Sequence, residues 1–171
     1  MRSAPVRVRA LVVGRFQPLH NGHCALIRQA LEECGDVAVG IGSSNAKPSL
    51  RNPFTLDERC RMVEAVFPHV RTVALPDIHD PPRWPAHVLG LTGPVDRVYG
   101  NDPEWTTLFE ATGMTVVSPG LVDRGRLEAR TIRAELAEGD AAWRKSVPTQ
   151  VAALLDSWGA AKRLLTLERA A

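Results

Sequence analysis

Short apolar runs rich in valine alternate along this chain with longer segments of helical period, and this alternation restricts the fold more than any other feature. Strands that are separated by helices pair in parallel through right-handed crossovers rather than as hairpins. Short continuous apolar runs are typical of strands buried on both faces. We therefore predict an α/β protein with a doubly wound parallel sheet. The five predicted strands are Val8–Val13, Val37–Ile41, Val70–Leu75, Val95–Tyr99 and Met114–Ser118.

Helical spacing marks the segments between these strands and returns after Pro119. Thr55 and Asp102 each precede such a segment, and their side chains can cap the free amides of a first helical turn. The stretch Pro76–Pro85 is rich in proline and is predicted to be a rigid irregular loop after the third strand. The predicted helices are His23–Glu33, Leu56–Val66, Pro85–Leu91, Glu104–Glu110, Thr131–Leu136 and a segment that runs from Val151–Leu155 toward Leu167.

Length and charge limit the class of protein. The chain has 171 residues, with 21 basic and 19 acidic side chains and a formal net charge of +2. A chain of this length predicts one domain over residues 1–171. The change of pattern after Pro119 divides it into an α/β core at about 6–125 and a helical C-terminal section at 126–171. The near-balanced charge argues against a nucleic-acid coat or a polybasic membrane anchor, because either needs an excess of Lys and Arg.

The cysteines and the apolar stretches indicate the cellular compartment of the protein. Cys24, Cys34 and Cys60 form neither a C-x-x-C pair nor an even set, which argues against disulfides and a structural zinc site. The stretch Ala10–Val13 is too short for a signal-peptide core, and no segment has the ~20 apolar residues of a membrane-spanning helix. We expect a soluble protein in the reducing cytoplasm.

The run from Gly14 to His23 follows the first predicted strand and leads into a helix, and it carries the sharpest functional signal. Gly14 lets the backbone turn at the strand end, and Gly22 lets it approach a phosphate closely. The amides at the start of the helix supply a partial positive charge. His20 and His23 lie three residues apart at this positive end, where imidazoles can donate hydrogen bonds to phosphoryl oxygens.

Other interpretations of these residues are structural. His20 and His23 could serve only as a helix cap, or they could ligate zinc together with Cys24, although that set lacks a fourth ligand. Cys24 is better explained as a small core residue. Arg59 is expected to be a solvated charge, the default for an arginine. Trp143 and Trp158 are assigned to packing in the helical section, and His69, His79 and His87 receive no role.

The run resembles the H-x-G-H signature of the nucleotidylyltransferase superfamily, and Gly-Arg-Phe-Gln-Pro within it is similar to the archaeal-type nicotinamide mononucleotide adenylyltransferases. Further landmarks of that family follow in its order between about Leu11 and Pro148. They are Ile41-Gly42-Ser43-Ser44, Arg51-Asn52-Pro53-Phe54-Thr55, Glu58-Arg59, Asp77 with Trp84 seven residues later, and Ile132-Arg133.

This resemblance implies a Rossmann-like fold and an enzyme that transfers an adenylyl group from ATP to nicotinamide mononucleotide, forming NAD and pyrophosphate. It implies Mg²⁺ as the companion of ATP, since hard oxygen ligands suit this ion. The expected partners are small-molecule substrates, with neither nucleic acid nor membrane, and we expect a homo-oligomer. Two alternatives stay open: transfer to flavin mononucleotide or phosphopantetheine, and a nucleotide-binding regulator without catalysis.

By the same resemblance, site residues carry over to matching positions. His20, His23 and Arg133 correspond to catalytic residues, and Arg51 and Trp84 to acceptor-binding residues, with Trp84 stacking on the nicotinamide ring. The implied ATP-binding residues are Gly14, Arg15, Phe16, Gly22, Asn101 and Thr131. No resident metal ligand is implied.

The sequence departs from the family pattern at two places. Arg130 and Glu128 stand where the family usually has small hydroxyl residues before the Ile-Arg pair. Pro81 stands where it often has an asparagine before the stacking tryptophan, and proline offers neither an amide side chain nor a backbone N–H. The second departure keeps a different acceptor open.

Overall fold

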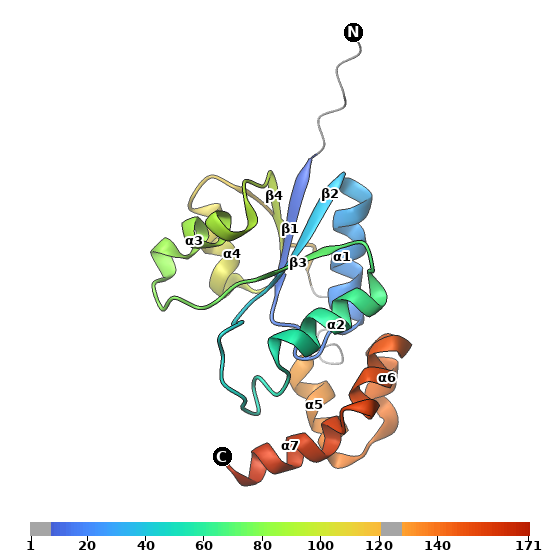
Figure 1. Ribbon diagram of the computed structural model, residues 1–171. Coiled ribbons are helices and arrows are strands. Elements are labelled where there is room, and N and C mark those ends of the chain that lie inside the picture. The colour runs from blue at the N-terminus through green and yellow to red at the C-terminus, as the bar shows by residue number, and fades with distance from the viewer. Residues whose placement is uncertain (1–7, 121–127) are drawn as a thin grey trace.

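Five parallel strands form a single sheet in the computed structural model, which describes residues 8–120 and 128–171 (Figure 1). Their order across the sheet is β3-β2-β1-β4-β5, so the chain winds outward first on one side of β1 and then on the other. The prediction of a doubly wound parallel sheet is confirmed. The strands are β1 Arg9–Gly14, β2 Asp36–Ile41, β3 Arg71–Ala74, β4 Arg97–Tyr99 and β5 Thr115–Val117.

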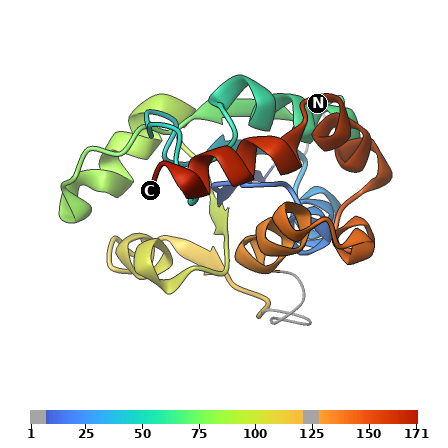
Figure 2. The same cartoon turned by 90° about the horizontal axis from the view of Figure 1, so that it is seen from below.

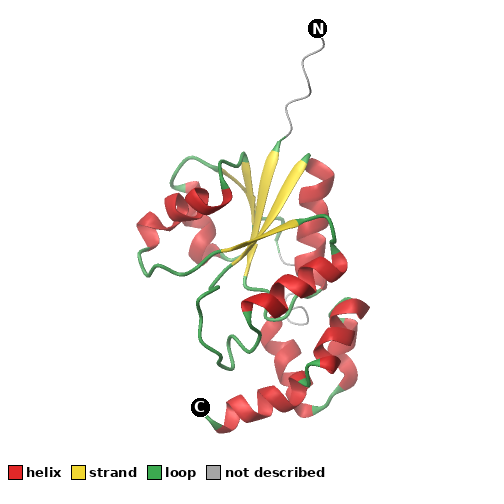
Figure 3. Cartoon of the chain, in the orientation of Figure 1, coloured by secondary structure: helices red, strands yellow, loops and turns green. Residues whose placement is uncertain are grey.

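Helices connect the strands and fill most of the chain after β5 (Figure 3). The predicted caps are confirmed, because the Thr55 side chain accepts a bond from Glu58 N at 3.2 Å and the Asp102 side chain accepts one from Glu104 N at 3.0 Å. The helices are α1 Asn21–Glu33, α2 Leu56–Val66, α3 Trp84–Thr92, α4 Pro103–Glu110, α5 Ala129–Glu138, α6 Thr149–Ser157 and α7 Ala160–Arg169, with short 3₁₀ turns η1 Pro81–Arg83 and η2 Ala141–Lys145.

The two faces of the sheet carry separate cores, which explains why β1 is apolar throughout. Ala10 and Val12 belong to the cluster that packs on α1 and α2, whereas Leu11 and Val13 belong to the cluster that packs on α3 and α4. Successive strand residues point to opposite faces, so a strand between two helical layers must be apolar at every position. Figure 1 shows α1 and α2 on one side of the sheet and α3 and α4 on the other.

The prediction of burial on both faces is wrong for the outer strands. In β3 and β5 no residue is fully buried, while four of the six residues of β1 and five of the six of β2 are. Both outer strands pair on one side only, so solvent reaches their free edge. The predicted strand bounds are also too long at β4, where residues 95 and 96 lie before Arg97.

The proline-rich stretch 76–85 is only partly the irregular loop that was predicted. Pro81–Arg83 forms a 3₁₀ turn, and Trp84 and Pro85 begin α3. Proline fits the first turn of a helix because its missing N–H would have no partner there. Trp84 therefore stands on the first turn of a helix rather than in a loop.

The C-terminal helices lie at the carboxyl ends of the strands, below the sheet in Figure 1 and in front of it in Figure 2, which is seen from below. Apolar side chains from α5, α6 and α7 join the same core cluster as those of β1 and α1. The predicted continuous helix toward Leu167 is divided, because Gly159 has a left-handed φ of 61° between α6 and α7. Trp143 is buried and Trp158 packs on this cluster, which confirms their assignment to packing.

Two further expectations concern the chain outside these elements. The expected boundary between residues 125 and 126, and residues 6 and 7 of the expected core, lie outside the described residues. Among the residues that the structure describes, no helix has the length and apolar character needed to cross a membrane.

Candidate active site

A cleft of about 730 Å³ opens at the carboxyl ends of the strands. It is lined by the segments that follow β1, β2, β3 and β4 and by the start of α5. The chain leaves β1 toward one side of the sheet and β4 toward the other, so the two segments diverge and leave a space between them. Ligands of doubly wound sheets bind at this kind of point.

Two histidines form the N-terminal cap of α1 and face the cleft. The Nδ1 atom of His20 accepts a hydrogen bond from His23 N at 3.3 Å, and the Nδ1 atom of His23 accepts one from His20 N at 3.4 Å. The rings stack with their centroids 3.6 Å apart and an interplanar angle of 21°. The reciprocal bonds are those of a capping box, with imidazoles in place of the usual hydroxyl and carboxylate.

The protonation of this pair follows from its surroundings. Burial lowers the pKa of His20 from 6.5 to about 4. Burial also lowers the pKa of His23 well below 6.5, with smaller contributions from His20 and Arg15. Both rings are therefore neutral near pH 7, and because each Nδ1 accepts a bond, the ring proton resides on Nε2. The pair keeps two Nε2–H donors for a ligand at the positive end of α1.

Four arginines give the cleft a concentrated positive charge: Arg15, Arg51, Arg130 and Arg133 all line it. Burial, together with smaller contributions from repulsion by Arg15, Arg51 and Arg130, lowers the pKa of Arg133 to about 10. Its Nη1 atom donates to the carbonyl of Gln17 at 2.7 Å. Such mutual repulsion is relieved when an anion binds, so the cleft favours a ligand with several negative charges.

Carboxylates balance part of this charge on one side of the cleft. Burial lowers the pKa of Arg15, as does Arg51, while Asp102, Glu104 and Asp77 raise it. All three carboxylates line the cleft. Among residues 8–120 and 128–171, no three His, Cys, Asp or Glu side chains are grouped so that they could hold a metal ion. A divalent ion in this cleft would take most of its ligands from a bound phosphate and water.

An aromatic group forms another wall. Trp84 and Trp105 line the cleft with ring centroids 6.1 Å apart, and Trp84 packs edge-on against Phe109 at 5.6 Å. Trp105 lies directly over Gly100, where a Cβ atom would be only 2.0 Å from the indole. An amphipathic wall of this kind can stack on a planar ring.

Backbone strain concentrates at the same cleft. Among the described residues other than glycine, those with positive φ are Phe16 at 53°, Ser43 at 47° and His79 at 53°. All three line the cleft. A non-glycine residue in this region carries strain that a surrounding structure must stabilise, and such residues cluster at functional sites.

The sequence profile of the cytidylyltransferase-like family matches residues 11–108. The nicotinamide-nucleotide adenylyltransferase of Picrophilus torridus is 36% identical over 165 residues, which cover 94% of this chain and 97% of that protein. The chain belongs to the nicotinamide-nucleotide adenylyltransferase family. The enzyme of the same name from Archaeoglobus fulgidus is 34% identical over 167 residues, covering 92% of this chain and 95% of the relative.

The fold of this chain is similar to that of a solved adenylyltransferase structure. A bifunctional NMN adenylyltransferase/ADP ribose pyrophosphatase from Francisella tularensis, complexed with AMP and a manganese ion, superimposes with a TM-score of 0.71 at 19% identity. The match covers 94% of this chain and 52% of that one, so the present chain spans about half the length of the bifunctional protein.

The structure brings almost all of the site residues implied by the resemblance to this family into one cleft. The residues that line it are Gly14, Arg15, Phe16, His20, Gly22, His23, Arg51, Trp84, Asn101 and Arg133. Thr131 does not appear among the lining residues of the described chain, whereas Glu128, Ala129 and Arg130 before it do. Thr131 lies in the first turn of α5, next to Arg130.

Two of these residues also have packing roles that the sequence did not suggest. Phe16 is only 1% exposed and contacts the His23 ring edge-on at 4.8 Å, so it holds that ring in place. Gly14 is needed for close packing, since a Cβ atom there would lie 2.8 Å from the Phe16 ring. Cys24 is fully buried, as predicted for a core residue.

The expectation for Arg59 is wrong. Its side chain is buried, with 1% of the residue exposed, and it donates to the carbonyls of Gly42 at 2.7 Å and Arg15 at 3.0 Å. It also bonds the carbonyls of Ser43 at 3.2 Å and Thr55 at 3.3 Å. Arg59 therefore ties the segment after β1 to the segment after β2. A single arginine in a helix looks the same in sequence whether it is solvated or buried; the Glu58-Arg59 landmark was the available signal.

Proposed function

We propose that this protein transfers an adenylyl group from ATP to nicotinamide mononucleotide, forming NAD and releasing pyrophosphate. The observation that carries the proposal is the His20–His23 pair, which caps α1 through its Nδ1 atoms and lines a cleft together with four arginines. The curated relatives named nicotinamide-nucleotide adenylyltransferase, at 36% and 34% identity, support the choice of reaction.

The chemistry requires position and positive charge more than a base. An oxygen of the acceptor's phosphate attacks the α-phosphorus of ATP in line. The new P–O bond forms as the bond between the α-phosphorus and its bridging oxygen breaks, and that electron pair leaves with pyrophosphate. A phosphate monoester has a second pKa near 6, so it has already lost its proton at neutral pH. Histidines with lowered pKa values suit this reaction because they act as donors.

The residues of the cleft divide this work. We assign the Nε2–H groups of His20 and His23 to the phosphoryl oxygens where negative charge grows in the transition state. The amides of the first turn of α1, including Gly22, add the partial positive charge of the helix end. Arg133 is assigned to the departing pyrophosphate, which gains charge as the bond breaks.

The remaining residues bind and orient the two nucleotides. We assign Arg15 to the triphosphate and Arg51 to the acceptor's phosphate, because a planar guanidinium can bind two oxygens at once. Trp84 provides the surface on which the nicotinamide ring stacks. Gly14, Phe16, Asn101 and Thr131 are assigned to the ATP side, with Phe16 acting through the His23 ring.

A divalent cation accompanies the triphosphate in this proposal, and we propose Mg²⁺. The cleft presents scattered carboxylates rather than a group that could hold a metal by itself. Bound to ATP, the ion would neutralise phosphate charge and favour the loss of pyrophosphate.

The experiment that tests the reaction is an end-point assay of purified protein with Mg-ATP and a panel of phosphate acceptors. Nicotinamide mononucleotide, flavin mononucleotide and phosphopantetheine are compared by pyrophosphate release, and NAD is identified by chromatography. We expect turnover with nicotinamide mononucleotide. Turnover only with another acceptor would show that the substrate is that acceptor and not nicotinamide mononucleotide. Nucleotide binding without any turnover would favour a nucleotide-binding regulator.

The histidine pair is tested by His20→Ala and His23→Ala. Each should lower kcat on the order of 10²-fold or more with a modest change in KM, because the lost contacts form mainly in the transition state. His69→Ala is the matched control, since His69 is exposed and is not among the described residues that line the cleft. Normal turnover in either cleft variant would refute the assignment.

Three broader expectations stay proposals. We propose that the chain works as one domain, supported by the core cluster that joins β1 and α1 to α5, α6 and α7. We propose that it acts in the cytoplasm and that copies associate into a homo-oligomer. Light scattering of the purified protein at assay concentration measures the last of these.

A further inference from the structure

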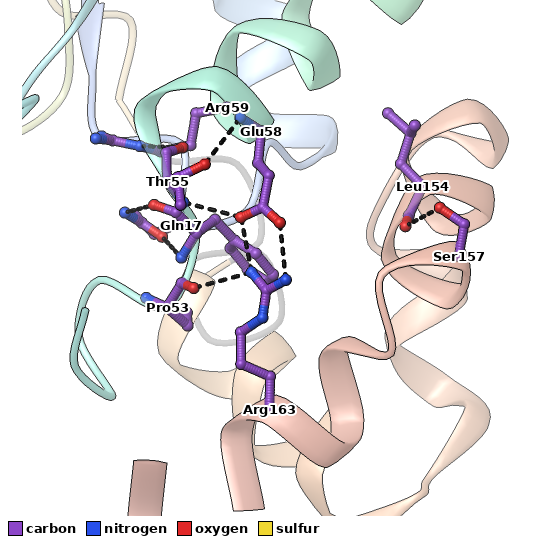
Figure 4. Close-up of polar contacts among 9 residues, drawn as sticks. Gln17, Pro53, Thr55, Glu58, Arg59, Leu154, Ser157 and Arg163 are labelled. Carbon is purple, nitrogen blue, oxygen red and sulfur yellow. Dashed lines mark hydrogen bonds and ion pairs between the residues drawn. The ribbon is translucent and has the colours of Figure 1, made fainter. Parts of the chain in front are cut away.

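The last helix of the chain contacts residues 53–58, which enter and begin α2 and are called the α2 segment here, and Figure 4 shows the residues that make this contact. From α7, Arg163 donates through Nη1 and Nη2 to the two carboxylate oxygens of Glu58, at 2.7 and 2.8 Å. Nη1 also donates to the carbonyl of Pro53 at 3.2 Å. The guanidinium lies 5.8 Å from the centroid of the Phe54 ring. The Arg163 side chain thus contacts a backbone carbonyl, a carboxylate and an aromatic ring, which belong to Pro53, Glu58 and Phe54.

This ion pair is sheltered. The side chains of Arg163 and Glu58 are 30% and 13% exposed, whereas those of Arg144 and Asp156, a similar two-pronged pair elsewhere in the helical section, are 49% and 52% exposed. Burial acts to raise the pKa of Glu58, but the bonds from Arg163 and Thr55 outweigh it, so this pKa lies below its ordinary value. A partly buried charge pair of this geometry is more costly to break than a solvated one.

The Gln17 side chain joins the α2 segment to the loop that carries His20. Gln17, only 2% exposed, accepts a bond from Phe54 N at 2.9 Å and donates to Phe54 O at 3.0 Å. Its own backbone carbonyl accepts the bond from Arg133. Gln17 lies three residues before His20, and Phe54 lies three residues after Arg51. The Gln17–Phe54 bonds therefore connect the loops that carry these two functional side chains.

We propose that Arg163 is a positioning residue for adenylyl transfer. It acts through Pro53, Glu58 and the Gln17–Phe54 bonds, which set the distance between the loop that carries Arg51 and the loop that carries His20. The proposal rests on the proposed function, because it concerns the geometry in which acceptor and ATP meet. A small misplacement of reacting groups lowers the rate constant more than it weakens binding, since each substrate still finds its own contacts.

The main test compares Arg163→Ala with Arg144→Ala. Each variant removes an arginine of the C-terminal section that forms two bonds to a carboxylate. The carboxylate is Glu58 in the α2 segment for Arg163, and Asp156 within the C-terminal section for Arg144. We expect Arg163→Ala to lower kcat on the order of tenfold with KM values changed less, and Arg144→Ala to leave both unchanged. Thermal unfolding of each variant shows that the protein is folded at the assay temperature. Equal kcat losses in the two variants, or wild-type kcat in a folded Arg163→Ala, would overturn the proposal.

Rescue and coupling separate positioning from general stability. Guanidinium ion, added well below denaturing concentrations, should restore part of the kcat of Arg163→Ala and none of the kcat of His20→Ala. Arg163→Lys keeps a cation and should retain more activity than the alanine variant; it also replaces that variant if alanine prevents folding. Gln17→Ala should lower kcat as well, and the double variant should lose less than the product of the two single losses. Fully multiplicative losses would show that Arg163 does not act through Gln17.

Hydrogen exchange provides a readout that does not depend on activity. In Arg163→Ala, the amides of residues 51–59 and 15–23 should exchange faster than in the wild type, while Arg144→Ala should leave them unchanged. If the wild-type protein forms no NAD, the proposed function fails while this comparison still reports on the connection. Unchanged exchange in both segments would refute the connection even in an active enzyme.

Discussion

Substitution of His20 by asparagine tests the neutral state of the histidine pair through protein stability. Asparagine is among the preferred N-cap residues, so it can still accept the bond from the first turn of α1, but it does not titrate. The pKa of His20 falls from 6.5 to about 4 on folding because the ring is buried. Between these values the unfolded chain binds a proton that the folded chain does not. The contribution of His20 to stability is therefore complete above pH 6.5 and is lost as the pH falls toward 4.

The size of the loss follows from the two pKa values. Each unit of difference corresponds to about 1.4 kcal/mol, so His20 accounts for about 3 kcal/mol when the pH reaches its folded pKa. At pH 5 the loss is about 2 kcal/mol, because the unfolded side chain is then almost fully protonated while the folded one is mostly neutral. Wild type and His20→Asn should therefore differ by this amount in the change of unfolding free energy between pH 7 and pH 5.

Urea denaturation at pH 7 and pH 5, followed by tryptophan fluorescence, measures this difference. His23 and the carboxylates are present in both proteins, so most of their contributions cancel in the comparison. His69→Asn is the control, because His69 is exposed and its substitution should leave the pH dependence unchanged. If His20→Asn and wild type lose the same free energy between the two pH values, His20 is not held neutral by burial, and its assignment as an Nε2–H donor fails.

Three substitutions test the walls of the cleft. Arg51→Lys should lower kcat/KM for the acceptor on the order of tenfold, because an ammonium cannot bind two oxygens as a guanidinium does; unchanged steady-state kinetics would remove Arg51 from the site. Trp84→Ala should lower the affinity for nicotinamide mononucleotide several-fold, because a stacking contact contributes about 1 kcal/mol, and should leave the affinity for a non-hydrolysable ATP analogue nearly unchanged; calorimetry measures both affinities. An equal loss for both ligands would contradict this. Gly100→Ala should reduce the unfolding free energy by about 1–3 kcal/mol in urea, because its Cβ would overlap Trp105; wild-type stability would show that the indole moves freely.

The fold and most of the cleft were predictable because their signals are local. The apolar run Ala10–Val13 predicts a buried strand by its own composition, and the alternation of strands with helices predicts a parallel sheet. The spacing of His20 and His23 places both at the start of one helix. The carboxyl ends of parallel strands lie at one edge, so Trp84 and Asn101, which follow different strands, could be expected near the same cleft.

Local sequence thus determined which segments become strands and helices and where the histidine pair stands, since caps and periodicity act within a few residues. Tertiary structure decided the partners of individual charges. Arg59 and Arg163 resemble any solvated arginine in sequence, yet one is buried under four carbonyls and the other reaches Glu58 across 105 positions of the chain. The physical reason is that a long charged side chain has no conformational preference strong enough to select its environment. Its burial depends on which carbonyls and carboxylates the packing of distant elements brings within reach.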